Sequence, residues 1–432
     1  MHTYVLIALL LILACTVSCA AVLPPDKPGM AVKVEAGQYT VRGKKVKVAA
    51  TTEVTIEAVD MIGVKNEWHV LGDEQPQTWH AGTGLNKTYG PVDIATRLPK
   101  AIAPETVKVH TADETTTYVE GKDYFLDHDW GGLCRIPTGS IPEKTKVFFD
   151  YKVYLQRVDA VQVSKDGQVS IKKGAAAQVC PEIPTADKDC TVLANIYVPY
   201  RTSAITADNI YPLPGKKLKW EDLIKVSGRE HLKKTLKTLK EGLYPISVVC
   251  WGDSVTSGGS SSTPDKCYVE LFRAWLKDVY PKSNPALLNA GIGGSNTDSR
   301  REGFDREVLS YRPDLITVEF VNDSGMSADQ IKKNWDEFIA RARAKSPEVE
   351  FILITPHSVM PEWMGGFKVS IPAMRKAAED NDVALADTAN IWENLRALGI
   401  PYQILEANGI NHPNDLGHQF FAACLQELLK RN

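Results

Sequence analysis

Hydrophobic and polar positions alternate with period two through much of the first half of the chain. In residues 146–155, Val147, Phe149, Tyr151 and Val153 share one face, which is the pattern of a strand with one side buried. Similar short runs, separated by Gly, Pro and Asp, occur at residues 46–49, 54–58, 118–126, 161–171 and 192–198. We therefore predict a β-rich accessory region over residues 30–213, built as one antiparallel sandwich or as two small ones.

The pattern changes after Pro214. Leu232, Leu236, Leu239 and Leu243 are spaced to line one side of a helix, and lysines occupy the other positions. A helix with one apolar stripe needs a neighbour that covers this stripe. We predict a helical connector over residues 214–243 that packs on the domain after it.

Strand and helix patterns alternate from residue 244 to the end. Short apolar runs at residues 246–251, 286–290, 315–320, 351–355 and 383–386 are typical of strands buried on both faces of a parallel sheet. Helical patterns lie between and after them, notably around residues 331–342, 372–381 and 415–430. This alternation predicts an α/β domain over residues 244–432 with a doubly wound parallel sheet. Ligands of such sheets bind beyond the carboxyl ends of the strands.

The first segment has the pattern of an export signal. Residues 5–17 are almost purely apolar, yet the run is shorter than the ~20 residues that span a bilayer as a helix. We therefore predict a signal peptide over residues 1–21 and no transmembrane segment in the mature chain. Thr16-Val17-Ser18-Cys19 resembles the bacterial lipobox, which makes Cys19 a candidate lipid anchor. The expected location is secreted, periplasmic or at the cell surface.

Composition narrows the classes of partner. The chain has 432 residues, of which 44% are hydrophobic and 24% charged, so it is long enough for two to three folded domains. A net charge of -3 provides no long-range attraction for nucleic acid, and we expect no nucleic-acid partner. Cys180 and Cys190 flank a turn-rich segment and are a candidate disulfide. The absence of a Cys-x-x-Cys motif or a His/Cys cluster predicts no metal, and we expect no cofactor.

Polar motifs follow three of the predicted strands, and a fourth lies near the end of the chain. Gly252-Asp253-Ser254 follows the first strand, a glycine-rich loop that includes Gly291 follows the second, and Asn322 follows the third. His412 precedes the last predicted helix. Since the carboxyl ends of parallel strands meet at one edge of a sheet, these residues are expected to converge.

These four blocks, in this order, resemble those of the SGNH hydrolases, also called GDSL esterases. The resemblance covers about residues 244–432, and the Ser, Gly, Asn and His that name the family fall on Ser254, Gly291, Asn322 and His412. It implies a three-layer α/β/α domain with a flavodoxin-like sheet. It also implies an oxyanion hole made by the backbone N–H groups of Ser254 and Gly291 and the side-chain amide of Asn322.

The chemistry of the residues agrees with this resemblance. A serine hydroxyl becomes a nucleophile when a neighbouring base removes its proton, and histidine is suited to that role near neutral pH. Ser254 is therefore the candidate nucleophile and His412 the candidate base, for hydrolysis of an ester through an acyl-enzyme.

Two positions depart from the family pattern. Phe320 stands where a glycine is usual, two residues before Asn322, so the loop is expected to differ or to narrow the acyl pocket. Gly409 stands where the family has the aspartate that orients the catalytic histidine. Asn408, Glu406, or a Ser-His dyad assisted by a backbone carbonyl could replace this aspartate, and the sequence leaves these alternatives open.

Three tryptophans in the first half of the chain allow two interpretations of its function. Trp68, Trp79 and Trp130 lie in loop-like surroundings, where exposed rings would be platforms for sugar rings, whereas buried rings would fill a sandwich core. The favoured prediction is a secreted esterase that removes acyl groups, especially acetyl, from carbohydrate or another small ester substrate. The alternatives are a lipase or lysophospholipase of the same family, and a catalytically impaired glycan-binding protein.

Overall fold

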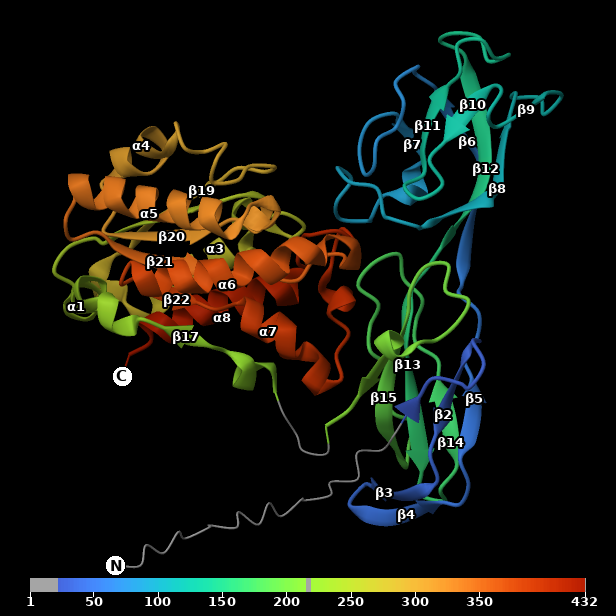
Figure 1. Cartoon of the computed structure of the whole chain (residues 1–432), viewed down its shortest axis with the longest axis horizontal. Helices are drawn as coiled ribbons and strands as arrows, with labels where there is room; N and C mark the ends of the chain where they lie inside the picture. The colour runs from blue at the N-terminus through green and yellow to red at the C-terminus, as the bar shows by residue number, and fades with distance from the viewer. Residues whose placement is uncertain (1–21, 215–218, 432) are drawn as a thin grey trace, which may run out of the picture.

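Two β-rich units precede an α/β domain in the computed structural model, which describes residues 22–214 and 219–431 (Figure 1). The expected signal peptide, including Cys19, lies outside the described residues, and so do residues 215–218 of the predicted connector. The chain enters one β unit, crosses to the second, returns to the first and then enters the α/β domain.

The first β unit is assembled from two separate stretches of chain. Its three sheets have the orders β1-β2-β5, β3-β4 and β14-β13-β15-β16. Their strands are β1 Val22–Leu23, β2 Ala31–Val34, β3 Gly37–Val41, β4 Lys44–Val48, β5 Thr52–Thr55, β13 Arg157–Ser164, β14 Val169–Lys172, β15 Cys190–Val198 and β16 Ile210–Pro212. Valines and isoleucines from all three sheets form its core.

The second β unit lies between these two stretches in sequence. It contains a four-stranded sheet of order β6-β12-β8-β9 and a three-stranded sheet of order β10-β11-β7. Their strands are β6 Met61–Val70, β7 Thr83–Gly84, β8 Ile102–His110, β9 Thr117–Tyr118, β10 Tyr124–Leu126, β11 Gly132–Arg135 and β12 Lys146–Tyr154. The predicted buried face of β12 is confirmed, since Val147, Phe149, Tyr151 and Val153 lie in the core of this unit.

The run at residues 161–171 forms a hairpin whose turn contains Asp166 and Gly167. Strands β13 and β14 pair antiparallel, with Val163 opposite Val169. Gly167 has φ +78°, in the left-handed region, and an added Cβ would lie 2.3 Å from the backbone oxygen of Lys47. This turn therefore requires glycine.

The α/β domain has a six-stranded sheet of order β17-β22-β21-β20-β18-β19. The strands are β17 Val226–Ser227, β18 Ser247–Gly252, β19 Ala286–Gly291, β20 Leu315–Glu319, β21 Glu350–Ile354 and β22 Ala384–Ala386. The helices are α1 Lys233–Glu241, α2 Ser254–Ser257, α3 Tyr268–Val279, α4 Phe304–Glu307, α5 Ala328–Lys345, α6 Met364–Asp380, α7 Ala389–Asn394 and α8 Asp415–Leu429. The five strands from β18 to β22 are parallel, so the doubly wound α/β prediction is confirmed.

Both faces of this sheet are covered by helices, as the near-continuous apolar strands require. Along β18, Val248 and Cys250 belong to the core that includes α3 and α8, whereas Val249 and Trp251 belong to the core that includes α5. Side chains of α6 contribute to both cores. The resulting three layers are visible on the left of Figure 1.

The segment before β18 was predicted to be a connector, but it is part of the α/β domain. Its strand β17 pairs antiparallel with β22, at the edge of the sheet. Leu232 and Leu239 are buried against the domain, as predicted, while Leu243 lies beyond the end of α1 and is exposed. The stretch therefore adds both a strand and a helix to the α/β domain.

Two sequence-based expectations differ from the structure. Helix α6 begins at Met364 and continues through Pro372, although the helical pattern suggested a start near this proline. Cys180 and Cys190 are both free thiols, so the candidate disulfide is not formed. Instead, the Cys180 sulfur accepts a hydrogen bond from the Asn414 amide at 3.6 Å, next to the final helix.

Phe338 provides a test of the packing on one face of the sheet. Its ring lies 4.8 Å from that of Trp251 and 4.9 Å from that of Phe304, and all three side chains are buried. Replacing it by alanine leaves a cavity, so we expect Phe338→Ala to lower the stability of the α/β domain by about 3–5 kcal/mol. Urea unfolding followed by tryptophan fluorescence measures this change. Val369→Ala, on the exposed side of α6, is the control and is expected to leave the midpoint unchanged.

Candidate active site

Ser254 lies at the sharp turn between strand β18 and the short helix α2. Gly252 precedes the turn, and a Cβ there would lie 2.0 Å from Thr256 Oγ1 and 2.3 Å from the backbone oxygen of Glu319. Asp253 fixes the turn, because its carboxylate accepts hydrogen bonds from the backbone N–H groups of Val255 and Asn322, each at 3.0 Å. The loop after β18 is thereby joined to the loop after β20.

Three side chains form a continuous hydrogen-bonded chain at this edge of the sheet. His412 Nε2 lies 2.9 Å from Ser254 Oγ, and His412 Nδ1 lies 2.9 Å from Asp93 Oδ2. This is the arrangement of a nucleophile, a base and an acid that orients the base. Asp93 belongs to the second β unit, in the segment between β7 and β8. The acid therefore comes from outside the α/β domain.

Polar contacts keep Asp93 ionised in a site that is largely closed to solvent. Burial alone would raise the pKa of its carboxyl group. Hydrogen bonds from His412, from the Ala95 backbone N–H at 2.9 Å and from Ser260 Oγ at 3.1 Å outweigh burial and lower this pKa to about 2. A carboxylate that stays charged at neutral pH can stabilise the imidazolium that forms when His412 accepts a proton.

Donors for an oxyanion are present beside Ser254. The Asn322 side-chain amide donates to the Ser295 backbone oxygen at 3.0 Å, which leaves its second hydrogen available. Asn322 therefore remains the candidate side-chain donor. Ser254 occupies the first position of helix α2, where the backbone N–H group has no partner within the helix.

Gly291 does not have the predicted role. Its N–H group donates to Asn289 Oδ1 at 2.9 Å, and its Cα faces the backbone of Thr256 and Ser257. A Cβ on Gly293 would instead lie 3.8 Å from Ser254 Cβ. No described residue accepts a hydrogen bond from the N–H groups of Gly293 or Gly294. Gly293 and Gly294, in the turn after β19, are therefore candidate backbone donors in place of Gly291.

Comparison with known proteins agrees with this geometry. Residues 250–420 match the model of the GDSL-like Lipase/Acylhydrolase family. The chain contains a GDSL-like hydrolase domain. The name of this family describes its members as lipases or acylhydrolases, which are enzymes that hydrolyse acyl esters. Residues 134–229, which span parts of both β units, match a domain of unknown function, DUF4815.

Individual relatives are distant. A curated relative from Bacillus subtilis (strain 168), the uncharacterized lipoprotein YqeF, is 30% identical over 112 residues, which are 24% of this chain and 46% of that protein. A two-domain esterase active on acetylated mannans is 20% identical to this chain and has a TM-score of 0.42. The match covers 50% of this chain and 58% of the esterase chain. A catalytic mutant of an acetylxylan esterase from Geobacillus stearothermophilus is 20% identical to this chain and has a TM-score of 0.35. The match covers 43% of this chain and 95% of the esterase chain. The chain thus spans about half the length of the first of these relatives.

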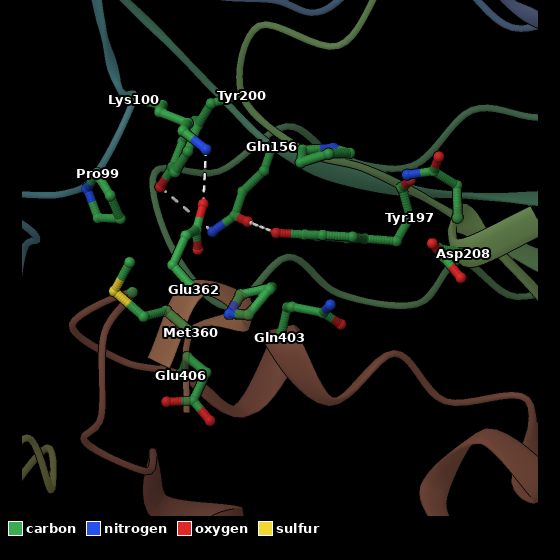
Figure 2. Close-up of a pocket in the computed structure, with 14 residues that line it drawn as sticks. Pro99, Lys100, Gln156, Tyr197, Tyr200, Asp208, Met360, Glu362, Gln403 and Glu406 are labelled. Carbon is green, nitrogen blue, oxygen red and sulfur yellow. Dashed lines mark hydrogen bonds and ion pairs between the residues drawn. The ribbon is translucent and has the colours of Figure 1, made fainter. Parts of the chain in front are cut away.

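Neither residue proposed from the sequence to orient His412 does so. Glu406 is buried beside a cavity of about 380 Å³ between the β units and the GDSL-like domain (Figure 2). Burial raises the pKa of Glu406 well above its ordinary value, and neither of its carboxyl oxygens has a hydrogen-bond partner among the described residues. Glu406 therefore makes no hydrogen bond with the His412 imidazole.

Asn408 has a different role from the predicted one. Its side-chain oxygen accepts hydrogen bonds from the backbone N–H groups of Ile410, Asn411 and His412, at 2.9–3.0 Å. Its amide nitrogen lies 3.3 Å from Asp93 Oδ2. Asn408 thus shapes the loop before His412 and contacts the acid, but it does not contact the imidazole.

Sequence reasoning missed Asp93 because no local signal marks it. It lies 319 positions before His412, within a region expected to be accessory. The only hint was negative: Gly409 occupies the usual aspartate position, so the acid had to come from elsewhere. Phe320, the second departure, is buried against Trp251 with ring centroids 4.7 Å apart, so its side chain belongs to the core on one face of the sheet.

Among the described residues, no helix is long and apolar enough to cross a membrane.

Asp93→Asn tests the acid directly. The amide keeps the size of the side chain but removes the charge that stabilises imidazolium, so we expect kcat to fall by roughly 10³–10⁴-fold with little change in KM. Steady-state hydrolysis of p-nitrophenyl acetate measures both constants. Glu406→Gln is the matched control, because it makes the same carboxyl-to-amide change, and we expect it to keep the wild-type kcat. An active Asp93→Asn enzyme would contradict the assignment.

Asn322→Ala tests the oxyanion hole. Loss of one donor to the developing negative charge is expected to lower kcat by roughly 10²–10³-fold. The same kinetic assay applies, and circular dichroism verifies the fold. Asn394→Ala is the control, since that amide donates only to Asn390 in helix α7. Equal activity of the two variants would show that Asn322 does not bind the oxyanion.

Proposed function

We propose that this protein is an exported serine esterase that removes small acyl groups, above all acetyl, from carbohydrate through an acyl-enzyme on Ser254. The observation that carries the proposal is the chain of two 2.9 Å contacts that joins Ser254, His412 and Asp93. The coarser statement, that the chain contains an ester hydrolase of the GDSL-like family, does not depend on this mechanism.

In the first half-reaction, Ser254 Oγ attacks the ester carbonyl carbon while His412 Nε2 takes the hydroxyl proton. The carbonyl oxygen becomes an oxyanion and accepts hydrogen bonds from the Ser254 N–H, the glycine turn at residues 293–294 and the Asn322 amide. When the tetrahedral intermediate collapses, the bond to the leaving alcohol breaks. His412 returns its proton to that alcohol, and the acyl group remains on Ser254.

In the second half-reaction, water takes the place of the alcohol. His412 removes a proton from the water, whose oxygen attacks the acyl carbon, and the bond to Ser254 Oγ then breaks. The carboxylic acid leaves and the serine hydroxyl is restored with the proton held by His412. Asp93 keeps its charge throughout and stabilises both imidazolium states.

Limited access to the nucleophile favours a small acyl group. Ser254 is only 8% exposed. On one side, a Cβ at Gly259 would lie 3.0 Å from His412 Cε1, and on the other Gly293 faces Ser254 Cβ. Such a small exposed fraction of the nucleophile suits acetyl better than the long acyl chain of a lipid, which disfavours the lipase alternative.

The impaired-enzyme alternative rested on the missing aspartate. Asp93 lies beside His412, where such an aspartate would lie, so the reason for proposing an impaired enzyme no longer applies. Export is supported by the apolar segment at residues 5–17 and by the name of the curated relative, which is a lipoprotein. We propose that Cys19 carries the lipid if the chain is anchored.

Acyl-chain preference tests the substrate class. We expect p-nitrophenyl acetate to be hydrolysed with a higher kcat/KM than the butyrate and the octanoate, and acetate to be released from acetylated polysaccharides. Ser254→Ala, which removes the nucleophile, is the control and is expected to be inactive on every ester. Preference for octanoate would favour the lipase alternative, and turnover by Ser254→Ala would overturn the acyl-enzyme mechanism.

A further inference from the structure

The four-stranded sheet of the second β unit has one covered face and one open face. Its inner face packs on β10 and β11 in the core of the unit. The other face, which we call the outer face, includes Met61, Trp68 and Val70 of strand β6, which are 45%, 51% and 42% exposed. These are among the most exposed large apolar side chains of the described residues, and they share one strand at the edge of the sheet.

Aromatic rings cross the outer face in register. Phe148 of β12 lies opposite Trp68 of β6 on one side and opposite His110 of β8 on the other. The rings of Phe148 and His110 are stacked, with centroids 6.2 Å apart and an interplanar angle of 29°. Tyr154, six residues further along β12, is on the same face by the period of the strand. His110 is fully buried, so the aromatic strip that this face presents consists of the exposed Trp68 and the partly exposed Phe148 and Tyr154.

Charged side chains surround this strip in nearly equal numbers of each sign. The basic groups are Lys65, Lys108, Lys146 and Lys152, and the acidic groups are Asp150, Glu105 and Glu114. Lys65 pairs with Asp150 at 2.7 Å, Lys108 lies 4.0 Å from Glu114, and Glu105 accepts a hydrogen bond from Tyr154 at 3.1 Å. Lys146 Nζ lies 3.7 Å from the centroid of the Trp68 ring.

The aromatic strip and the paired charges together favour some classes of binding partner and disfavour others. Carboxylates paired with the lysines cancel most of the positive charge that a polyanion such as nucleic acid would need. Lysine and acidic residues are depleted at the cores of protein interfaces, which makes a docked protein a poor match. A neutral sugar ring fits both the aromatic strip and the paired charges. Its C–H face can stack on an aromatic ring, and its hydroxyls can donate hydrogen bonds to the carboxylates and accept them from the lysines.

We propose that the outer face of this sheet binds a neutral polysaccharide, so that the enzyme holds the polymer that carries its ester. The identity of the ligand as a glycan rests on the proposed function, but the site is separate from the catalytic residues. The face belongs to the same unit as Asp93, whose segment leads directly into strand β8. Binding at this face therefore attaches the polymer to the unit that completes the active site.

Affinity gel electrophoresis of the full chain tests the proposal. The probes are deacetylated xylan, deacetylated glucomannan and mixed-linkage β-glucan, with polygalacturonate and single-stranded DNA for comparison. We expect retardation by at least one neutral polysaccharide, with an affinity that changes little between low and high salt. Trp68→Ala is expected to weaken this affinity about tenfold, and Lys152→Gln to weaken it less.

Tyr311→Ala is the matched control, since it removes an exposed aromatic ring from the GDSL-like domain, and it is expected to bind as the wild type does. All three variants should hydrolyse p-nitrophenyl acetate at the wild-type rate, which shows that they are folded. No retardation by any neutral polysaccharide, unchanged binding by Trp68→Ala, or tighter binding of polygalacturonate or DNA would overturn the proposal. An esterase failure with retained retardation would contradict the proposed function alone.

Discussion

The hydrogen bond between Asp93 and His412 is the contact on which the site depends, because it crosses from the β-rich part of the chain to the GDSL-like domain. An imidazole accepts a proton from serine more efficiently when a fixed anion orients it and stabilises the resulting charge. Among the described residues, no carboxylate of the GDSL-like domain forms a hydrogen bond with the His412 imidazole, and Asp93 of the second β unit does. Catalysis therefore depends on the position of the second β unit relative to the GDSL-like domain.

Several contacts across the same boundary hold that position. Leu98 is fully buried and packs near Gly409, where an added Cβ would lie 3.2 Å from the leucine side chain. Lys100 pairs with Glu362 at 2.6 Å, as Figure 2 shows, and Asn195 donates to the Gly399 backbone oxygen at 2.7 Å. The apolar and polar contacts together define the orientation of the two parts.

The sequence was sufficient for the elements whose formation depends on local pattern. The strands from β18 to β22 were recognisable because each is apolar on both faces, and β12 because alternate residues are buried. Ser254, Asn322 and His412 could be placed since each follows or precedes such an element. Gly291 was misplaced by two or three residues, because the end of a strand and the turn after it are both glycine-rich. Asp93 could not be found, since no periodicity relates a loop in a β unit to a histidine in another domain.

A comparison of Glu406 with Asp93 explains why the acid had to come from a distance. Both carboxyl groups are buried near the loop that carries His412, but burial by itself favours the neutral form. Glu406 has no hydrogen-bond donor beside it among the described residues, and burial raises its pKa well above the ordinary value. Asp93 receives donors from Ser260, Ala95 and His412, which together outweigh the cost of burial. Proximity to histidine is therefore insufficient for catalysis, and the surrounding donors decide which carboxylate can act.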